Sequence, residues 1–197
     1  EISAGLPYLL EEDFSTVETF SSHDNYTGGL NSGDRDSKSF LNGWSGGRVG
    51  ASAGLCVRIA CRRETTADYA ARMDSAPIIE LNKPADLELV FDYGTNNEYN
   101  YSAGDQGQTV QVGYVTTSVA LSSGNKEGIF DSANSFQTNE KTGSWTSTPN
   151  NSVITLTNVP TGVVRISWRT TPFHREGFSN TTCWLYIDNV KVRIKSN

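Results

Sequence analysis

The chain has 197 residues and a formal net charge of −6 at pH 7, from 16 basic and 22 acidic side chains. That balance argues against a non-specific nucleic-acid partner. No apolar run approaches the ~20 residues of a membrane-spanning helix. The length is sufficient to bury about 70% of the surface of the unfolded chain. We expect residues 1–197 to form a single domain, because no linker-like stretch divides them.

Short strands separated by turn residues follow one another along the chain. Residues 65–73 are the one helical candidate. A weak strand is expected at 135–138, inside a long polar region. The other predicted strands are 6–14, 38–43, 54–61, 76–82, 86–94, 109–116, 152–159, 162–170 and 183–195. Roughly ten strands with apolar residues on one face predict an all-β, antiparallel two-sheet sandwich, commonly a jelly roll at this size.

The last predicted strand carries the pair Asp188 and Asn189, two residue types that strands usually exclude. Ile187 before the pair and Val190 after it both have the pattern of inward-facing residues. A strand of period two needs an extra residue to place both inward, so we predict a β-bulge at the pair. A bulge turns a side chain out of the ladder and makes it available for other contacts.

Both ends of the chain carry short motifs that belong together. The first strand ends in Asp13-Phe14, Gly43-Trp44 follows, and Ile187-Asp188-Asn189-Val190 lies in the last strand. This outline resembles jelly-roll modules, concanavalin-like or galactose-binding-like, of secreted bacterial proteins. They include calcium-containing carbohydrate-binding modules and MAM-like domains. The resemblance implies that the first and last strands are neighbours.

The resemblance also implies a structural calcium ion between these strands, held by an acidic side chain from each end and by backbone carbonyls. Asp13 and Asp188 are the metal-ligand candidates. Modules with the metal often carry Glu after the Phe, where this chain has Ser15, so Asp13 or Glu12 would supply the first carboxylate. In the alternative, Asp188 accepts hydrogen bonds from loop amides or an Arg and only closes the sandwich.

Aromatic residues beside polar side chains are candidates for glycan contact, because sugars stack on aromatic rings and hydrogen-bond through their hydroxyls. Most of them fall in loops, where rigid scaffolds usually carry binding residues. Two lie on the last strand and are either a binding pair or covered by a loop. The candidates are Tyr99, Tyr101, Trp145, Phe173, His174, Arg175, Trp184 and Tyr186. Trp168 is expected in the core, and Trp44 is either structural or a contact residue.

Catalytic motifs are scarce. There is no Gly-x-Ser-x-Gly elbow and no His-Glu-x-x-His. Asp86, Glu88 and Asp92 share a strand face and come nearest to the carboxylate pattern of jelly-roll glycosidases, but Val90 interrupts it. A solvent-facing strand explains them more simply, and a hydrolase or lyase is the third interpretation of the chain.

The leading hypothesis is a non-catalytic, polysaccharide-binding module of an exported protein, at the cell surface or in the periplasm. The alternative is a protein-binding or adhesive module of the MAM-like kind, whose partner is a cell-surface protein. The chain begins at Glu1, so a signal peptide or lipid-anchor cysteine could precede it in the precursor. Three cysteines, Cys56, Cys61 and Cys183, leave at least one thiol unpaired. Cys56 and Cys61 lie too far apart along one strand to bridge directly, and Cys183 could reach one of them only if the two strands are neighbours. In the alternative, all three are free thiols.

Overall fold

The computed structural model describes residues 6–17, 20–21, 38–47, 49–52, 56–62, 72–95, 109–116, 135–137, 150–170 and 182–196. Within these ranges the chain forms fourteen strands and no helix. The strands make two seven-stranded sheets, called sheet A and sheet B below, whose neighbouring strands are antiparallel. The predicted all-β antiparallel sandwich is confirmed.

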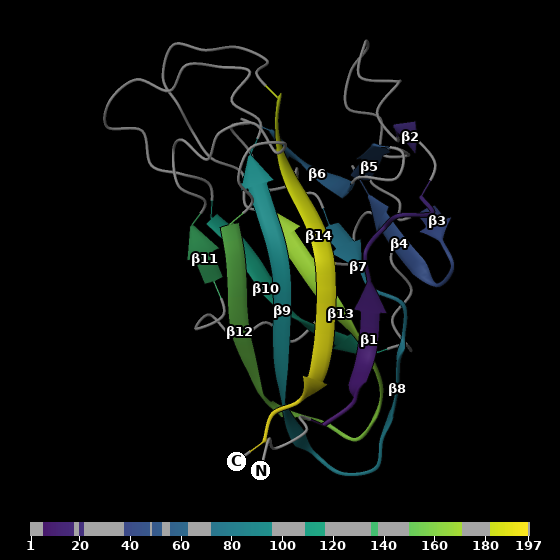
Figure 1. Cartoon of the computed structure of the whole chain (residues 1–197), viewed down its shortest axis with the longest axis vertical. Coiled ribbons are helices and arrows are strands. Elements are labelled where there is room, and N and C mark those ends of the chain that lie inside the picture. Colours follow the sequence, from purple (N-terminus) through teal and green to yellow (C-terminus); the bar gives the residue numbers. More distant parts are fainter. Residues whose placement is uncertain are drawn as a thin grey trace.

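The two sheets lie face to face, with part of sheet A in front in Figure 1. Sheet A has the order β12 (Asn150–Val159), β9 (Ala85–Thr95), β14 (Thr182–Ile194), β6 (Cys56–Arg62), β5 (Val49–Ser52), β2 (Phe20–Ser21), and β1 (Tyr8–Glu12) also pairs with β14. Sheet B has the order β11 (Ser135–Gln137), β10 (Thr109–Thr116), β13 (Gly162–Thr170), β7 (Arg72–Asp74), β4 (Trp44–Gly47), β3 (Lys38–Leu41), and β8 (Ile78–Leu81) also pairs with β13.

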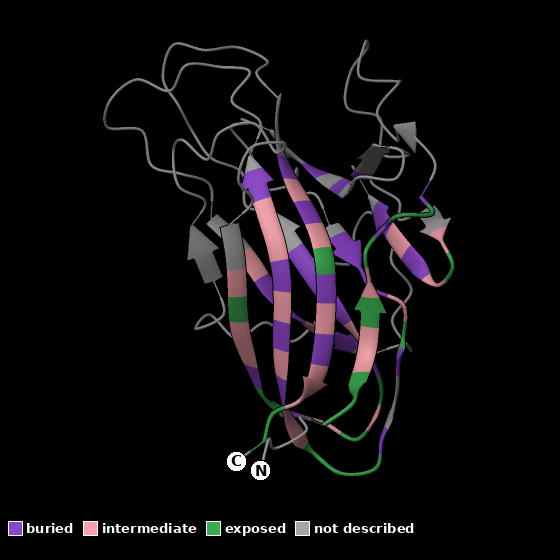
Figure 2. Ribbon diagram, viewed as in Figure 1, coloured by how far each residue is buried: buried purple, intermediate pink, exposed green. Residues whose placement is uncertain are grey.

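Alternating apolar residues build the core between the sheets. Along β9, for example, Leu87, Leu89 and Phe91 are fully buried, and buried and half-buried residues alternate along β9 and β14 in Figure 2. Trp168, predicted in the core, stacks on Trp44 with ring centroids 6.1 Å apart. Both indoles are buried, so Trp44 is a structural residue and not a surface contact.

The first and last strands are neighbours, as the resemblance implied. β1 runs antiparallel to β14, with Glu12 opposite Val190 and Glu11 opposite Lys191. The predicted bulge in β14 is also confirmed. On the partner strand β9, Asp92 pairs with Asp188 and Val90 pairs with Lys191, so β14 holds one extra residue between the two pairs.

The extra residue of the bulge is accommodated by Asn189, whose φ is +49°. This left-handed conformation is strained for most side chains, and Asn is one of the few non-glycine residues that adopt it often. The Asp-Asn pair therefore allows the β-bulge to form in β14, whether or not it also binds a ligand.

The helical interpretation of residues 65–73 was wrong at its end. Arg72–Asp74 is strand β7, and Met73 is buried opposite Trp168 of β13. The rest of that segment lies outside the described residues. Pairing with neighbouring strands overrides local helix propensity here.

The sequence patterns also missed the short strands β2, β4 and β5. On β14, the backbone register sets Cys183 opposite Cys61.

Candidate functional site

The end of β1 turns sharply so that a large apolar side chain enters the core. Phe14 has φ +51° and is fully buried, with its ring centroid 5.0 Å from that of Trp44. Two carboxylates support this turn. The Phe14 N–H donates to Glu12 Oε1 at 2.7 Å, and the Ser15 N–H donates to Asp13 Oδ1 at 2.9 Å. The two acidic side chains are thereby held at the edge of β14.

The bulge of β14 brings further acidic groups to the same place. Asp188 lies directly opposite Asp92 in the β9–β14 register. The Asn189 side-chain amide donates to Asp92 Oδ2 at 2.8 Å and reaches Asp188 Oδ2 at 3.4 Å. Asp188 Oδ1 is buried and has no hydrogen-bond partner. One carboxylate oxygen is thus withdrawn from water without any donor.

The pKa of the Asp188 carboxyl is raised from 3.8 to about 6. Burial is the main cause, and the negative charges of Asp92, Asp13 and Glu12 contribute in the same direction, whereas a backbone hydrogen bond from Asn189 acts against them. The pKa of Asp13 is lowered instead, because its carboxylate accepts hydrogen bonds from Ser15. We call Glu12, Asp13, Asp92 and Asp188 the acidic seam. A positive charge placed there would relieve the repulsion around Asp188.

A hollow of about 420 Å³ opens beside the acidic seam. Its lining residues are Glu11, Glu12, Asp13, Asn189 and Lys191, which come from the end of β1 and from β14 at and after its bulge. The lining therefore combines carboxylate acceptors with an amide and an ammonium donor. Small-molecule pockets in proteins typically range from about 300 to 1,000 Å³, so the hollow is large enough for one.

A row of charged and aromatic side chains continues along the outer side of sheet A. The ring of Tyr8, which is 41% exposed, has Lys191 Nζ at 5.4 Å and the Arg193 guanidinium at 5.7 Å from its centroid. Lys191 Nζ lies 3.9 Å from Glu11 Oε1. Because Lys191 also lines the hollow, its contact with Tyr8 places the tyrosine ring next to the hollow.

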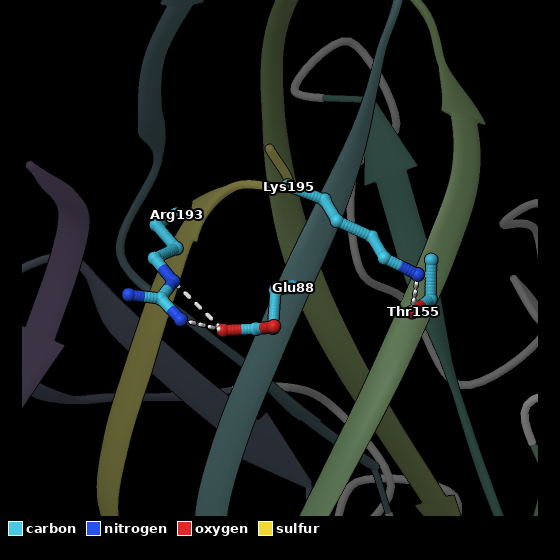
Figure 3. A network of polar contacts seen from close by, with 4 residues as sticks. All are labelled: Glu88, Thr155, Arg193 and Lys195. Atoms are coloured by element: carbon cyan, nitrogen blue, oxygen red, sulfur yellow. Dashed lines mark hydrogen bonds and ion pairs between the residues drawn. The ribbon is translucent and has the colours of Figure 1, made fainter. Parts of the chain in front are cut away.

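Figure 3 shows the end of this row, where Arg193 binds Glu88 and Lys195 reaches Thr155 across β9. Arg193 Nε and Nη2 both donate to the same oxygen, Glu88 Oε1, at 2.7 and 2.5 Å. Arg193 thereby joins β14 to β9, and Lys195, which directly follows β14, reaches β12. Both contacts lie on the far side of β14 from β1.

The three carboxylates that came nearest to a glycosidase pattern each have a separate contact. Asp86 Oδ1 accepts from the Asn158 N–H at 2.8 Å, and Glu88 binds Arg193. Asp92 accepts from Asn189. These contacts give the row on β9 a role in joining strands.

Six of the eight predicted ligand contacts lie outside the described residues: Tyr99, Tyr101, Trp145, Phe173, His174 and Arg175. Trp184 is described only by its backbone, opposite Ala60. Tyr186 is half-buried between Leu185 and Ile187, both fully buried, so its side chain is on the outer side of sheet A. That position is one alternation before Asp188.

Of the predicted metal pair, the structure brings Asp13 and Asp188 within electrostatic reach of each other. Sequence reasoning missed Tyr8, Glu11, Asp92 and Lys191 as parts of the site. The alternate cations of "KVRIK" facing the first strand were the signal that could have found Lys191. In the described ranges, no three His, Cys, Asp or Glu side chains form a group that could hold a metal ion.

The described residues define an all-β protein, an antiparallel two-sheet sandwich with the acidic seam beside its first and last strands. No protein-family model matches the chain, and no curated protein matches it. Within its described residues there is no helix of the length and apolarity needed to cross a membrane.

Several solved structures are similar at low identity. The K1 cleaved adhesin domain of Lys-gingipain from Porphyromonas gingivalis W83 has a TM-score of 0.46 and 14% identity, over 95% of this chain and 98% of that one. The K3 adhesin domain of the same protein has 0.44 and 15%, over 94% and 99%. The CBM22-2 xylan-binding domain of Paenibacillus barcinonensis Xyn10C has 0.42 and 13%, over 95% and 99%.

Proposed function

We propose that the chain is a non-catalytic glycan-binding module that holds a polysaccharide on the outer side of sheet A, beside the acidic seam. The observation that carries this proposal is the 420 Å³ hollow lined by both donors and acceptors. Sugar hydroxyls need both, because each hydroxyl donates one hydrogen bond and accepts others. The amide of Asn189 and the ammonium of Lys191 would donate, and Glu11 would accept.

An aromatic surface lies on either side of these polar groups. Tyr8 lies next to Lys191, and Tyr186 precedes the bulge on the same side of sheet A. Aromatic rings present a flat apolar surface to the C–H side of a pyranose. A chain of several sugar units could therefore run along β14, with hydroxyls over the hollow and rings against tyrosine.

We also propose that the acidic seam binds a calcium ion through Asp13 and Asp188. Two observations support a hard cation there: Asp188 Oδ1 is buried without a hydrogen-bond partner, and the charges of Asp92, Asp13 and Glu12 disfavour ionisation of Asp188. Backbone carbonyls would complete the ligand set, since two carboxylates alone are too few for calcium. The ion would supply positive charge that joins the first strand to the last.

A polysaccharide screen by affinity electrophoresis tests the function. Gels containing neutral or acidic polysaccharides should retard wild-type protein in at least one case, and Lys191→Ala should lower that retardation. Lys195→Ala is the matched control, because Lys195 directly follows the same strand, β14, but does not line the hollow. Retardation by none of the polysaccharides would refute the function and would favour the protein-binding alternative.

The calcium proposal has its own experiment. Thermal unfolding in calcium should occur at a higher temperature than in EDTA, because an ion that binds only the folded state stabilises it by about 2.7 kcal/mol at 100 times its Kd. Asp188→Asn should abolish the difference. Identical unfolding of the wild type in calcium and EDTA would remove the ion without affecting the glycan proposal.

A further inference from the structure

The three cysteines of the chain lie on two strands that pair with each other. Cys56 begins β6, Cys61 lies near the end of the same strand, and Cys183 is the second residue of β14. The two strands are antiparallel neighbours over six consecutive residue pairs, with no shift in register. Within this run Cys183 is directly opposite Cys61. The condition under which Cys183 can reach another cysteine is therefore met.

The backbone distance across such a pair suits a disulfide. Residues directly opposite each other on antiparallel strands have Cα atoms about 4.5 or 5.5 Å apart, depending on whether the pair is hydrogen-bonded. Disulfides usually join cysteines whose Cα atoms are about 4.4–6.8 Å apart. Both kinds of pair fall within this range, so the Cα separation requires no movement of the backbone.

Cys61 and Cys183 also occupy the same face of sheet A. Residues alternate between the two faces of a strand, so Cys61 shares the face of Ile59, two residues before it, and Cys183 shares that of Leu185, two residues after it. Ile59 and Leu185 are fully buried and are opposite each other in the same register. The cysteine pair thus continues a buried residue pair by one alternation along both strands.

Cys56 does not compete for Cys183. It is five residues from Cys61, about 16 Å along a strand, and the odd separation sets it on the opposite face of sheet A. On β5 its register partner is Ser52. Of the three pairings that the cysteines allow, the register therefore favours Cys61 with Cys183 and leaves Cys56 as the single thiol.

We propose that Cys61 and Cys183 form a disulfide that joins β6 to β14. The oxidant is a small-molecule disulfide or the disulfide of a thiol oxidoreductase, as oxidising compartments supply. One cysteine thiolate attacks this disulfide, forms a mixed disulfide and releases one thiol of the oxidant. The other thiolate then attacks the protein sulfur of the mixed disulfide and releases the second thiol, so the protein loses two hydrogens and the oxidant gains them.

The bond fastens the strand that carries the hollow. Asn189 and Lys191 line the hollow and lie further along β14 than Cys183. Strand β14 pairs with β6 only as far as Ile187, before the bulge, and the disulfide adds a covalent link near the start of this paired run. It also closes a loop of about 120 residues, and closing a long loop removes much of the entropy of the unfolded chain.

Alkylation of the whole wild-type chain tests the pairing and needs no variant. The protein is equilibrated with a glutathione mixture in which the reduced form is in excess, which keeps an unpaired cysteine as a thiol. It is then alkylated with iodoacetamide in denaturant, with and without prior reduction, and weighed by mass spectrometry. One cysteine should be alkylated without reduction and three after it. Digestion with pepsin at acidic pH should release a linked pair of peptides that contain Cys61 and Cys183.

Thermal unfolding with and without a reductant gives a second readout. Reduction should lower the unfolding temperature of the wild type by roughly 5–15 °C and should leave that of Cys61→Ser unchanged. Cys56→Ser is the matched control, because it removes a cysteine of the same strand and should lose as much as the wild type on reduction. Three alkylated cysteines without reduction, or a linked peptide that contains Cys56, would overturn the proposal. So would a wild-type unfolding temperature that reduction does not change.

Discussion

Replacing Asp188 by Asn should stabilise the calcium-free protein at neutral pH and change how its stability depends on pH. The pKa of Asp188 is raised from 3.8 to about 6, mainly by burial. The folded state therefore favours the protonated, neutral form of Asp188. The stability that this form provides is fully present below about pH 3.8 and is lost as the pH rises through about 6. Stability of the wild type in EDTA should therefore increase as the pH falls from 7.5 to 4.5.

The magnitude follows from the same pKa. A rise from 3.8 to about 6 corresponds to roughly 3 kcal/mol between the two protonation states. Asp188 is only half-buried, and solvent screening reduces this to about 1–2 kcal/mol. Asp188→Asn keeps the shape and removes the charge, so it should be more stable than wild type by about 1–2 kcal/mol at pH 7.5.

Urea unfolding of wild type and Asp188→Asn in EDTA, at several pH values from 4.5 to 7.5, measures this difference. The Asp13 carboxyl, whose pKa is lowered, acts in the opposite direction but below this range, so it does not mask the effect. The difference should decrease as the pH falls from 7.5 to 4.5, and it should vanish only below about pH 3.8. A variant that is less stable than wild type at pH 7.5, or a difference independent of pH, would refute the reasoning.

Two further predictions concern the place where the turn between β3 and β4 approaches the connection between β7 and β8. Gly43→Ala should lower the free energy of unfolding by about 2 kcal/mol, because the φ of Gly43 is +80° and an added Cβ would lie 3.1 Å from Ala76 Cβ. Gly162→Ala is the control: its φ is +100°, but its Cβ would enter open space, so it should lower the free energy of unfolding by less. Equal losses of the two variants in urea unfolding would contradict the steric part of the argument. Arg165→Met should lower the free energy of unfolding by about 1.5–3 kcal/mol, because Arg165 Nη1 donates to the backbone carbonyls of Gly43 and Ser75. A loss under about 0.5 kcal/mol in the same urea assay would show that these two hydrogen bonds do not stabilise the fold.

Long alternating runs made most of the fold predictable. The pattern of residues 86–94 gave the buried face of β9, and the phase change around Asp188 gave the bulge, because both depend only on the two-residue period of a strand. Short strands such as β4 and β7 could not be found this way. Each has four residues or fewer, and its neighbours in the sheet determine its conformation.

The candidate site was predictable only in part. Asp13 and Asp188 were expected together from the motifs at the two ends of the chain, and the structure brings both into the acidic seam, near the pairing of β1 with β14. Tyr8 and Lys191 were not expected, because their proximity depends on the register between strands at opposite ends of the chain. A single sequence does not specify that register.

Chemical-shift mapping by NMR tests the central claim of glycan binding beside the seam most directly. An oligosaccharide of a polysaccharide that retards the protein would be added to the isotope-labelled chain. The account predicts shifts concentrated at Glu11, the Asn189 side-chain amide and Lys191, with little change along β12. Saturable shifts elsewhere in the chain that leave these three residues unchanged would contradict it.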